Sequence, residues 1–107
     1  MTPDIVNELV DDLYAESVDD FVGLWEVTGV LSAQRPEADD DELRRLGALT
    51  VQGLVDAGLL IGDLVSGRGF VPWDDPLDVG RVMAMWHALG RLPNMGDDIC
   101  WFARPGA

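Results

Sequence analysis

Two side chains have the chemistry of a nucleophilic site, His87 and Cys100. They are the only histidine and the only cysteine, so a histidine-based triad would need His87 together with Cys100 or a serine. No nucleophile-elbow motif surrounds Ser17, Ser32 or Ser66. The pattern favours an exposed or hydrogen-bonded imidazole at His87 and a small buried hydrophobe at Cys100, and it predicts no catalytic residue.

Four aspartates stand in two short segments that flank a predicted helix, at Asp74, Asp75, Asp97 and Asp98. Carboxylates that converge from two loops suit Mg²⁺ or Ca²⁺, so a small metal-dependent enzyme is one hypothesis for the chain. However, the spacing matches no calcium-binding loop, and Asp75 precedes Pro76 as a helix N-cap does. We therefore expect neither a metal nor another cofactor.

Arg68 lies between two glycines in the segment Ser66–Gly69. A glycine-rich loop can cradle a phosphate, but this one lacks the Gly-x-x-x-x-Gly-Lys pattern and precedes a strand rather than a helix. The segment instead predicts a solvated turn at the tip of a β-hairpin.

Negative charge is concentrated in the first part of the chain. The formal net charge is −13, and residues 1–42 hold thirteen acidic residues against one arginine, whereas residues 43–107 hold seven against six. An acidic surface repels phosphate backbones and attracts basic partners, which disfavours nucleic acid as a ligand. Solubility alone is the alternative explanation.

Aromatic residues are dense in the last third of the chain, at Phe70, Trp73, Trp86, Trp101 and Phe102. One cluster between a sheet and the last helix would account for most of them. They cannot all be fully buried in so small a domain, and a partly exposed Trp73 or Trp101 would suit a protein interface. Together with the acidic residues, this predicts a surface for a basic protein partner, formed by Asp11, Asp12, Asp19, Asp20, Asp39, Asp40, Asp41, Trp73 and Trp101.

Three helices are predicted in the acidic part of the chain, residues 1–57. The first has Thr2 as its N-cap and Pro3 at its first position. The second begins at Ser17, where Ser17–Asp20 resembles a capping box, and it places Phe21 and Trp25 in the core. The third spans residues 41–57, where Gly47 and Gly53 would permit the close approach of another helix.

The second part, residues 58–107, is predicted to be a hairpin, a helix and a strand. Gly58 ends the third helix, and a hairpin over residues 60–73 follows. The fourth helix begins with Asp75-Pro76 and ends at Gly90, and a strand over residues 99–103 joins the hairpin. The expected fold is a single α+β domain over residues 1–107, with about four helices, a β-hairpin and a C-terminal strand.

A helix, a stop glycine and a hairpin, carried by Asp41–Ala57, Gly58-Leu59-Leu60 and Leu60–Trp73, resemble the winged-helix family. The resemblance implies a recognition helix in residues 41–57, a wing tip at Ser66–Gly69, and a dimeric transcription regulator that contacts DNA through Arg44, Arg45 and Arg68. Two features depart from the family pattern: three aspartates precede Arg44 and Arg45, and a further helix and strand follow the wing.

The chain also resembles the small acidic immunity proteins of bacteria that neutralise toxin domains. This likeness rests on size, acidity and the segment Gly90–Phe102. It implies a non-enzymatic protein that binds and inhibits a basic partner. No apolar run long enough to span a membrane and no secretion signal is visible, so a cytoplasmic location is expected.

Overall fold

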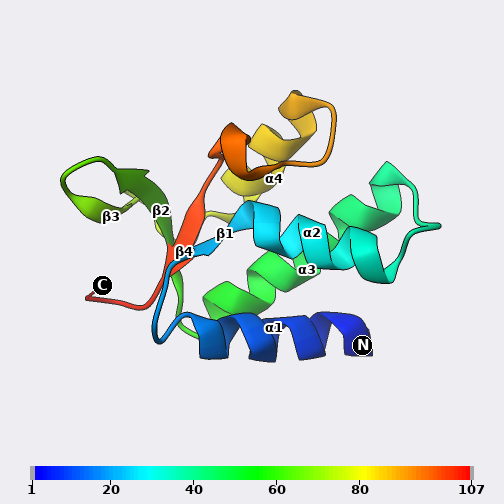
Figure 1. The fold of residues 1–107 in the computed structure, drawn as a ribbon, viewed down its shortest axis with the longest axis horizontal. Coiled ribbons are helices and arrows are strands. Elements are labelled where there is room, and N and C mark those ends of the chain that lie inside the picture. The colour runs from blue at the N-terminus through cyan, green and yellow to red at the C-terminus, as the bar shows by residue number, and fades with distance from the viewer. Residues whose placement is uncertain (1, 107) are drawn as a thin grey trace.

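The computed structural model describes residues 2–106 as four α-helices and a four-stranded antiparallel sheet (Figure 1), which confirms the α+β class. The elements, in chain order, are α1 (Asp4–Glu16), β1 (Val22–Gly23), α2 (Leu24–Gln34), α3 (Asp40–Asp56), β2 (Leu60–Val65), β3 (Gly69–Pro72), α4 (Val79–Leu89), a 3₁₀ turn (Met95–Asp97) and β4 (Trp101–Ala103). None of the helices in the described range is long and apolar enough to cross a membrane.

The last strand lies inside the sheet, where the strand order is β1-β4-β2-β3. β4 pairs with β2, so the prediction that it joins the hairpin is confirmed, and on its other side it pairs with β1. In Figure 1 the strands lie side by side, and the β2–β3 hairpin extends away from α1, α2 and α3. The sheet therefore ties the start of α2 to the end of the chain.

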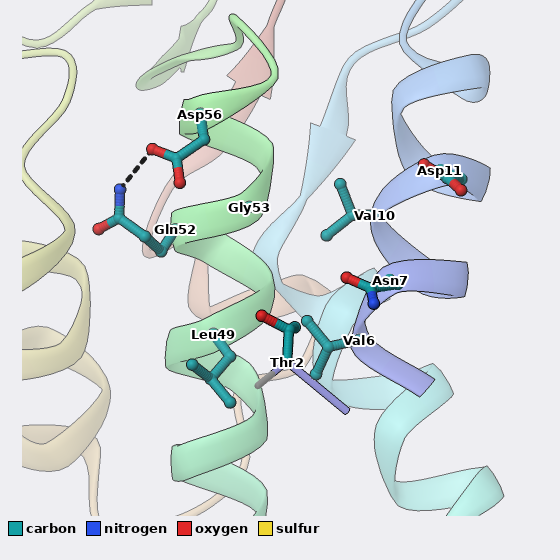
Figure 2. Close-up of a pocket in the computed structure, with 9 residues that line it drawn as sticks. All are labelled: Thr2, Val6, Asn7, Val10, Asp11, Leu49, Gln52, Gly53 and Asp56. Atoms are coloured by element: carbon teal, nitrogen blue, oxygen red, sulfur yellow. Dashed lines mark hydrogen bonds between the residues drawn. The ribbon is translucent and has the colours of Figure 1, made fainter. Parts of the chain in front are cut away.

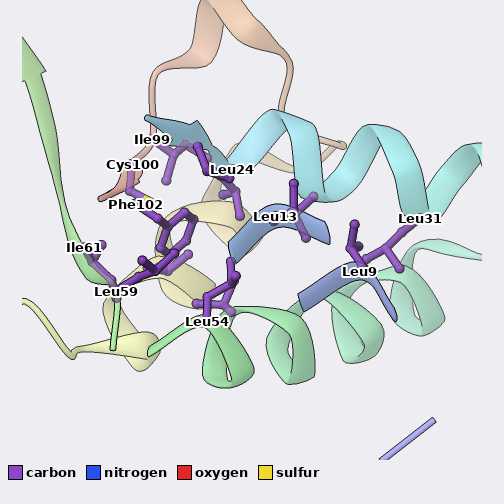
Figure 3. Packing of buried hydrophobic residues seen from close by; sticks show 14 of the residues in the cluster. Leu9, Leu13, Leu24, Leu31, Leu54, Leu59, Ile61, Ile99, Cys100 and Phe102 are labelled. Carbon is purple, nitrogen blue, oxygen red and sulfur yellow. The ribbon is translucent and has the colours of Figure 1, made fainter. Parts of the chain in front are cut away.

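One row of side chains links the sheet to the helices. Val22, Phe102 and Ile61 are neighbours across β1, β4 and β2, and all three are 0% exposed. Figure 3 shows Phe102 and Ile61 packed with leucines from the helices. The core cluster includes buried residues from both parts of the chain, among them Leu9, Leu13, Leu24, Leu31, Leu54, Leu59 and Trp73. Burial of this apolar surface is the main stabilising contribution to the fold.

Two glycines of α3 allow its neighbours to pack closely, as predicted. A Cβ atom on Gly53 would lie 2.6 Å from Val10 of α1. A Cβ on Gly47 would lie 2.3 Å from the ring of Trp86 in α4, which is 1% exposed. The missing side chains therefore let α1 and α4 approach the α3 backbone.

The beginning of the chain differs from the prediction at two caps. Pro3, not Thr2, is the N-cap residue of α1, and it makes no side-chain capping bond. Ser17 does not begin a helix: it ends α1, and its hydroxyl donates to the carbonyl oxygen of Tyr14 at 2.5 Å. The second helix starts at Leu24, because the preceding residues pair with β4 as a short strand that the sequence did not reveal.

The fourth helix also starts later than predicted. Asp78 is its N-cap and accepts from the backbone N–H of Arg81 at 2.9 Å, while Asp75 accepts from the N–H of Leu77 in the preceding turn. The carbonyl oxygen of Pro76 accepts from the N–H of Ile61, so this segment is held against β2. The predicted stops are confirmed, with φ of 111° at Gly58 and 77° at Gly90.

Replacement of a helical glycine by alanine is predicted to have opposite effects on stability at Gly47 and at Gly29. Gly47→Ala is expected to lower the free energy of unfolding by about 1–2 kcal/mol, because displacing the buried Trp86 ring outweighs the better helix propensity of alanine. Gly29→Ala, in α2, is the matched control, since no atom lies within 4 Å of its added Cβ. It should raise stability by up to about 1 kcal/mol. Urea unfolding of both variants measures the difference, and a stabilised Gly47→Ala variant would contradict the packing.

Candidate protein-binding surface

The predicted acidic residues fall into three groups. Asp11 and Asp12 are exposed on α1, Asp19 and Asp20 are exposed in the turn before β1, and residues 39–41 are exposed at the start of α3. The eleven residues of α2, a length of about 16 Å, separate the second group from the third. The structure therefore does not gather these residues into one compact cluster.

Most of these carboxylates are not neutralised by the chain's own arginines. Arg44 pairs with Asp41, and Arg45 pairs with Glu42 at 2.6 Å. The hydrogen bond from Arg45 lowers the pKa of Glu42. The third ion pair within residues 2–106 joins Arg91 to Asp97, so eleven of the thirteen acidic residues in residues 1–42 form no ion pair.

One group of carboxylates lies where α1 ends and α2 begins. Burial, together with the negative charges of Glu16 and Asp20, raises the pKa of Glu26 to about 7. Glu16, Trp25 and Glu26 also line a shallow hollow of about 380 Å³ with Leu13 of α1. Two glutamates and Asp20 thus share one region of negative potential beside an indole ring.

A layer of four aromatic rings, the outer aromatic layer, covers part of the sheet face opposite the core. It consists of Phe21, Trp25, Phe70 and Trp101, none of which belongs to the core cluster. The rings of Phe21 and Phe70 stack with centroids 5.9 Å apart. Phe21, Trp25 and Trp101 are half-buried, so the prediction that Phe21 and Trp25 are core residues is wrong.

Two glycines on this face make room for the rings. A Cβ on Gly23 would lie 2.5 Å from Nε1 of Trp25 and 3.0 Å from the ring of Trp101. A Cβ on Gly62 would lie 2.8 Å from the ring of Phe70. Gly23 and Gly62 both pair with Trp101, in the row next to the buried row of the core. The spacing of two glycines and four aromatics over eighty residues of sequence gave no signal of this arrangement.

The two tryptophans predicted as contact residues lie on opposite faces of the sheet. Trp101 belongs to the outer aromatic layer, and its Nε1 donates to Asp98 at 2.5 Å. Trp73 belongs to the core and is 6% exposed, so of these two tryptophans Trp101 is the one that is partly exposed. The guanidinium of Arg81 lies over the ring of Trp73, 3.8 Å from the centroid. The five aromatics of the last third therefore do not form one cluster.

The remaining residues that the sequence suggested for a metal or catalytic site lie apart from one another, are buried, or already have hydrogen-bond partners. Asp97 is held by Arg91 through two bonds of 2.6 and 2.7 Å, and Asp98 by Trp101. Within residues 2–106, no three histidine, cysteine, aspartate or glutamate side chains are placed to hold a metal ion. His87 is exposed, whereas Cys100 is 2% exposed and burial raises the pKa of its thiol, as expected of an unreactive cysteine.

A larger hollow, of about 440 Å³, lies between α1 and α3 (Figure 2). Val6, Val10 and Leu49 form its apolar part, and polar side chains surround them. The amide of Gln52 donates to Asp56 at 2.9 Å, and both residues belong to α3. Asp11 is the predicted contact residue that reaches this hollow.

Comparison of the chain with models of known protein families, with curated proteins and with solved structures gives no match. The function must therefore be inferred from the surface itself.

The pKa of Glu26 predicts a pH-dependent stability. The pKa in the folded protein, about 7, lies above the ordinary value of 4.5, so the folded state binds this proton more tightly than the unfolded state. The contribution of Glu26 is therefore most favourable below about pH 4.5 and is lost as the pH rises to 7. Glu26→Gln should raise the free energy of unfolding at pH 8 by on the order of 1 kcal/mol, since partial exposure screens the effect.

Urea unfolding between pH 5 and pH 8 measures this effect. The Glu26→Gln curve should change less with pH than the wild-type curve does. Glu8→Gln makes the same chemical change at an exposed position of α1 and should follow the wild-type profile. Parallel profiles for the wild type and Glu26→Gln would show that Glu26 is not the group responsible.

Proposed function

We propose that this chain is a non-enzymatic protein-binding module, acting in the cytoplasm as an inhibitor or immunity protein for a basic partner. The observation that carries the proposal is the set of eleven acidic residues in residues 1–42 that form no ion pair with the chain's own arginines. Unpaired exposed carboxylates leave a negative potential that only an outside cation can neutralise.

Such a potential acts chiefly on the rate of association. Complementary charge accelerates the encounter of two proteins at low salt, and screening removes the gain as ionic strength rises. The three acidic groups need not touch the partner together, because steering depends on the summed field rather than on one cluster. Asp11, Asp12 and Asp19 would attract the partner even where other residues make the final contacts.

The alternative function is a DNA-binding regulator of winged-helix type. The α3 helix and the hairpin favour it, and Arg68 at the hairpin tip is exposed. Arg44 and Arg45 already pair with Asp41 and Glu42, so phosphate contacts would have to replace these ion pairs. A metal-dependent enzyme is a second alternative, but Asp97 and Asp98 already have other partners.

Capture from native lysate tests the proposal. The immobilised chain should retain proteins that are more basic than the background at ~50 mM salt and release them at ~500 mM salt. The triple variant Asp11→Asn, Asp12→Asn and Asp19→Asn should slow association with a captured protein about tenfold at low salt. The variant Asp56→Asn, Asp63→Asn and Asp74→Asn changes net charge equally within residues 43–107 and should have a smaller effect. Retained proteins no more basic than the background would contradict the proposal.

A gel-shift assay separates the DNA-binding alternative from the proposal. Genomic fragments at ~50 mM salt, where phosphate contacts are strongest, should show no retardation by the wild-type chain. If retardation occurs and Arg68→Ala abolishes it, the regulator function replaces the proposed one.

A further inference from the structure

In the outer aromatic layer, half-buried rings lie close to carboxylates that form no ion pair. Asp20 accepts from the backbone N–H of Phe21 at 2.8 Å, and Asp98 accepts from the indole of Trp101. Glu26 follows Trp25 in α2 and lines the same hollow. None of these three carboxylates forms an ion pair within residues 2–106.

Two aromatic rings elsewhere in the chain are each covered by the guanidinium of an arginine. The guanidinium of Arg81 lies 3.8 Å from the ring centroid of Trp73, and that of Arg104 lies 4.1 Å from the ring centroid of Tyr14. In the described residues no arginine lies over a ring of the outer aromatic layer. Arg104, which is close in sequence to Trp101, is held by Tyr14 and by the hydroxyl of Ser17. The faces of Trp25 and Trp101 are thus without a cation.

We propose that a basic segment of a protein partner docks on the outer aromatic layer, with arginine or lysine side chains over Trp25 and Trp101 and close to Asp20, Glu26 and Asp98. This inference rests on the proposed function and names where on the chain the partner binds. A cation over an indole face gains more as water is excluded, and adjacent carboxylates add charge-assisted hydrogen bonds. Tryptophan at the centre of an interface is also the residue type that contributes most to affinity.

The indole N–H of Trp25 belongs to the same layer and has no hydrogen-bond partner. It lies against Gly23, where the absence of a side chain leaves the ring close to the backbone. An unpaired buried donor is costly, and a small shift of the ring toward a partner carbonyl would satisfy it. Its resonance is therefore a sensitive reporter of an approaching peptide.

The indole N–H resonances of the four tryptophans provide the experiment. A synthetic peptide of five Arg-Gly repeats is added to the ¹⁵N-labelled chain at ~150 mM salt, where interactions over more than ~8 Å are screened. The resonances of Trp25 and Trp101 should shift and saturate with added peptide. Those of Trp73 and Trp86, which are 6% and 1% exposed, should stay unchanged and serve as internal controls. A Glu-Gly peptide of equal length should produce no shift.

Charge variants test the carboxylates without disturbing the rings. The double variant Asp20→Asn and Asp98→Asn keeps an oxygen acceptor for Phe21 and Trp101 and should weaken peptide binding about five- to tenfold. The double variant Glu8→Gln and Glu37→Gln changes net charge equally at exposed positions on α1 and in the loop before α3, and it should weaken binding less than twofold.

Three other outcomes would contradict the proposed docking site. Saturable shifts confined to residues 39–41 or to Asp11 and Asp12, with Trp25 and Trp101 unchanged, would place the basic segment elsewhere and leave the proposed function intact. Equal weakening by the two double variants would mean that only net charge matters. Absence of saturable binding would remove this site, while the lysate capture judges the proposed function independently.

Discussion

The pairing of β4 with both β1 and β2 is the constraint on which the rest of this fold depends. It aligns Val22, Phe102 and Ile61 in one fully buried row, and this row joins the sheet to the helices. The same pairing turns Gly23, Trp101 and Gly62 to the opposite face, because neighbouring residues of a strand point to opposite sides. One register thus determines both the core and the aromatic surface.

Local signals in the sequence were sufficient for the elements that depend on backbone chemistry. Gly58 and Gly90 adopt positive φ and end their helices, and the turn before Gly69 forms the expected hairpin. The close approach at Gly47 and Gly53 was also predictable, since a glycine inside a helix is costly unless it makes room for a neighbour. These features need only a few adjacent residues, and for that reason the α+β class could be predicted.

The features that were missed depend on partners distant in sequence. Ser17 has the composition of an N-cap, but Val22 and Gly23 pair with β4, so the chain runs extended where a helix was expected. The half-buried rings of Phe21 and Trp25 belong to a layer completed by residues far along the chain. The acidic bias was evident from composition, whereas the ion pairs of Arg44 and Arg45 and the separation of the three groups required coordinates.

The central position of β4 also bears on how the chain folds. Val22 and Phe102 are about 80 residues apart in sequence, and closing so long a loop must precede any gain from their contact. Helices α1 and α3, whose contacts are more local, can associate before this closure. Completion of the sheet then waits until residues 101–103 have left the ribosome, and until that moment the edges of β1 and β2 are open to other strands. Because Phe102 is also 0% exposed, a change at this residue would affect both the equilibrium stability of the core and the step that completes the sheet.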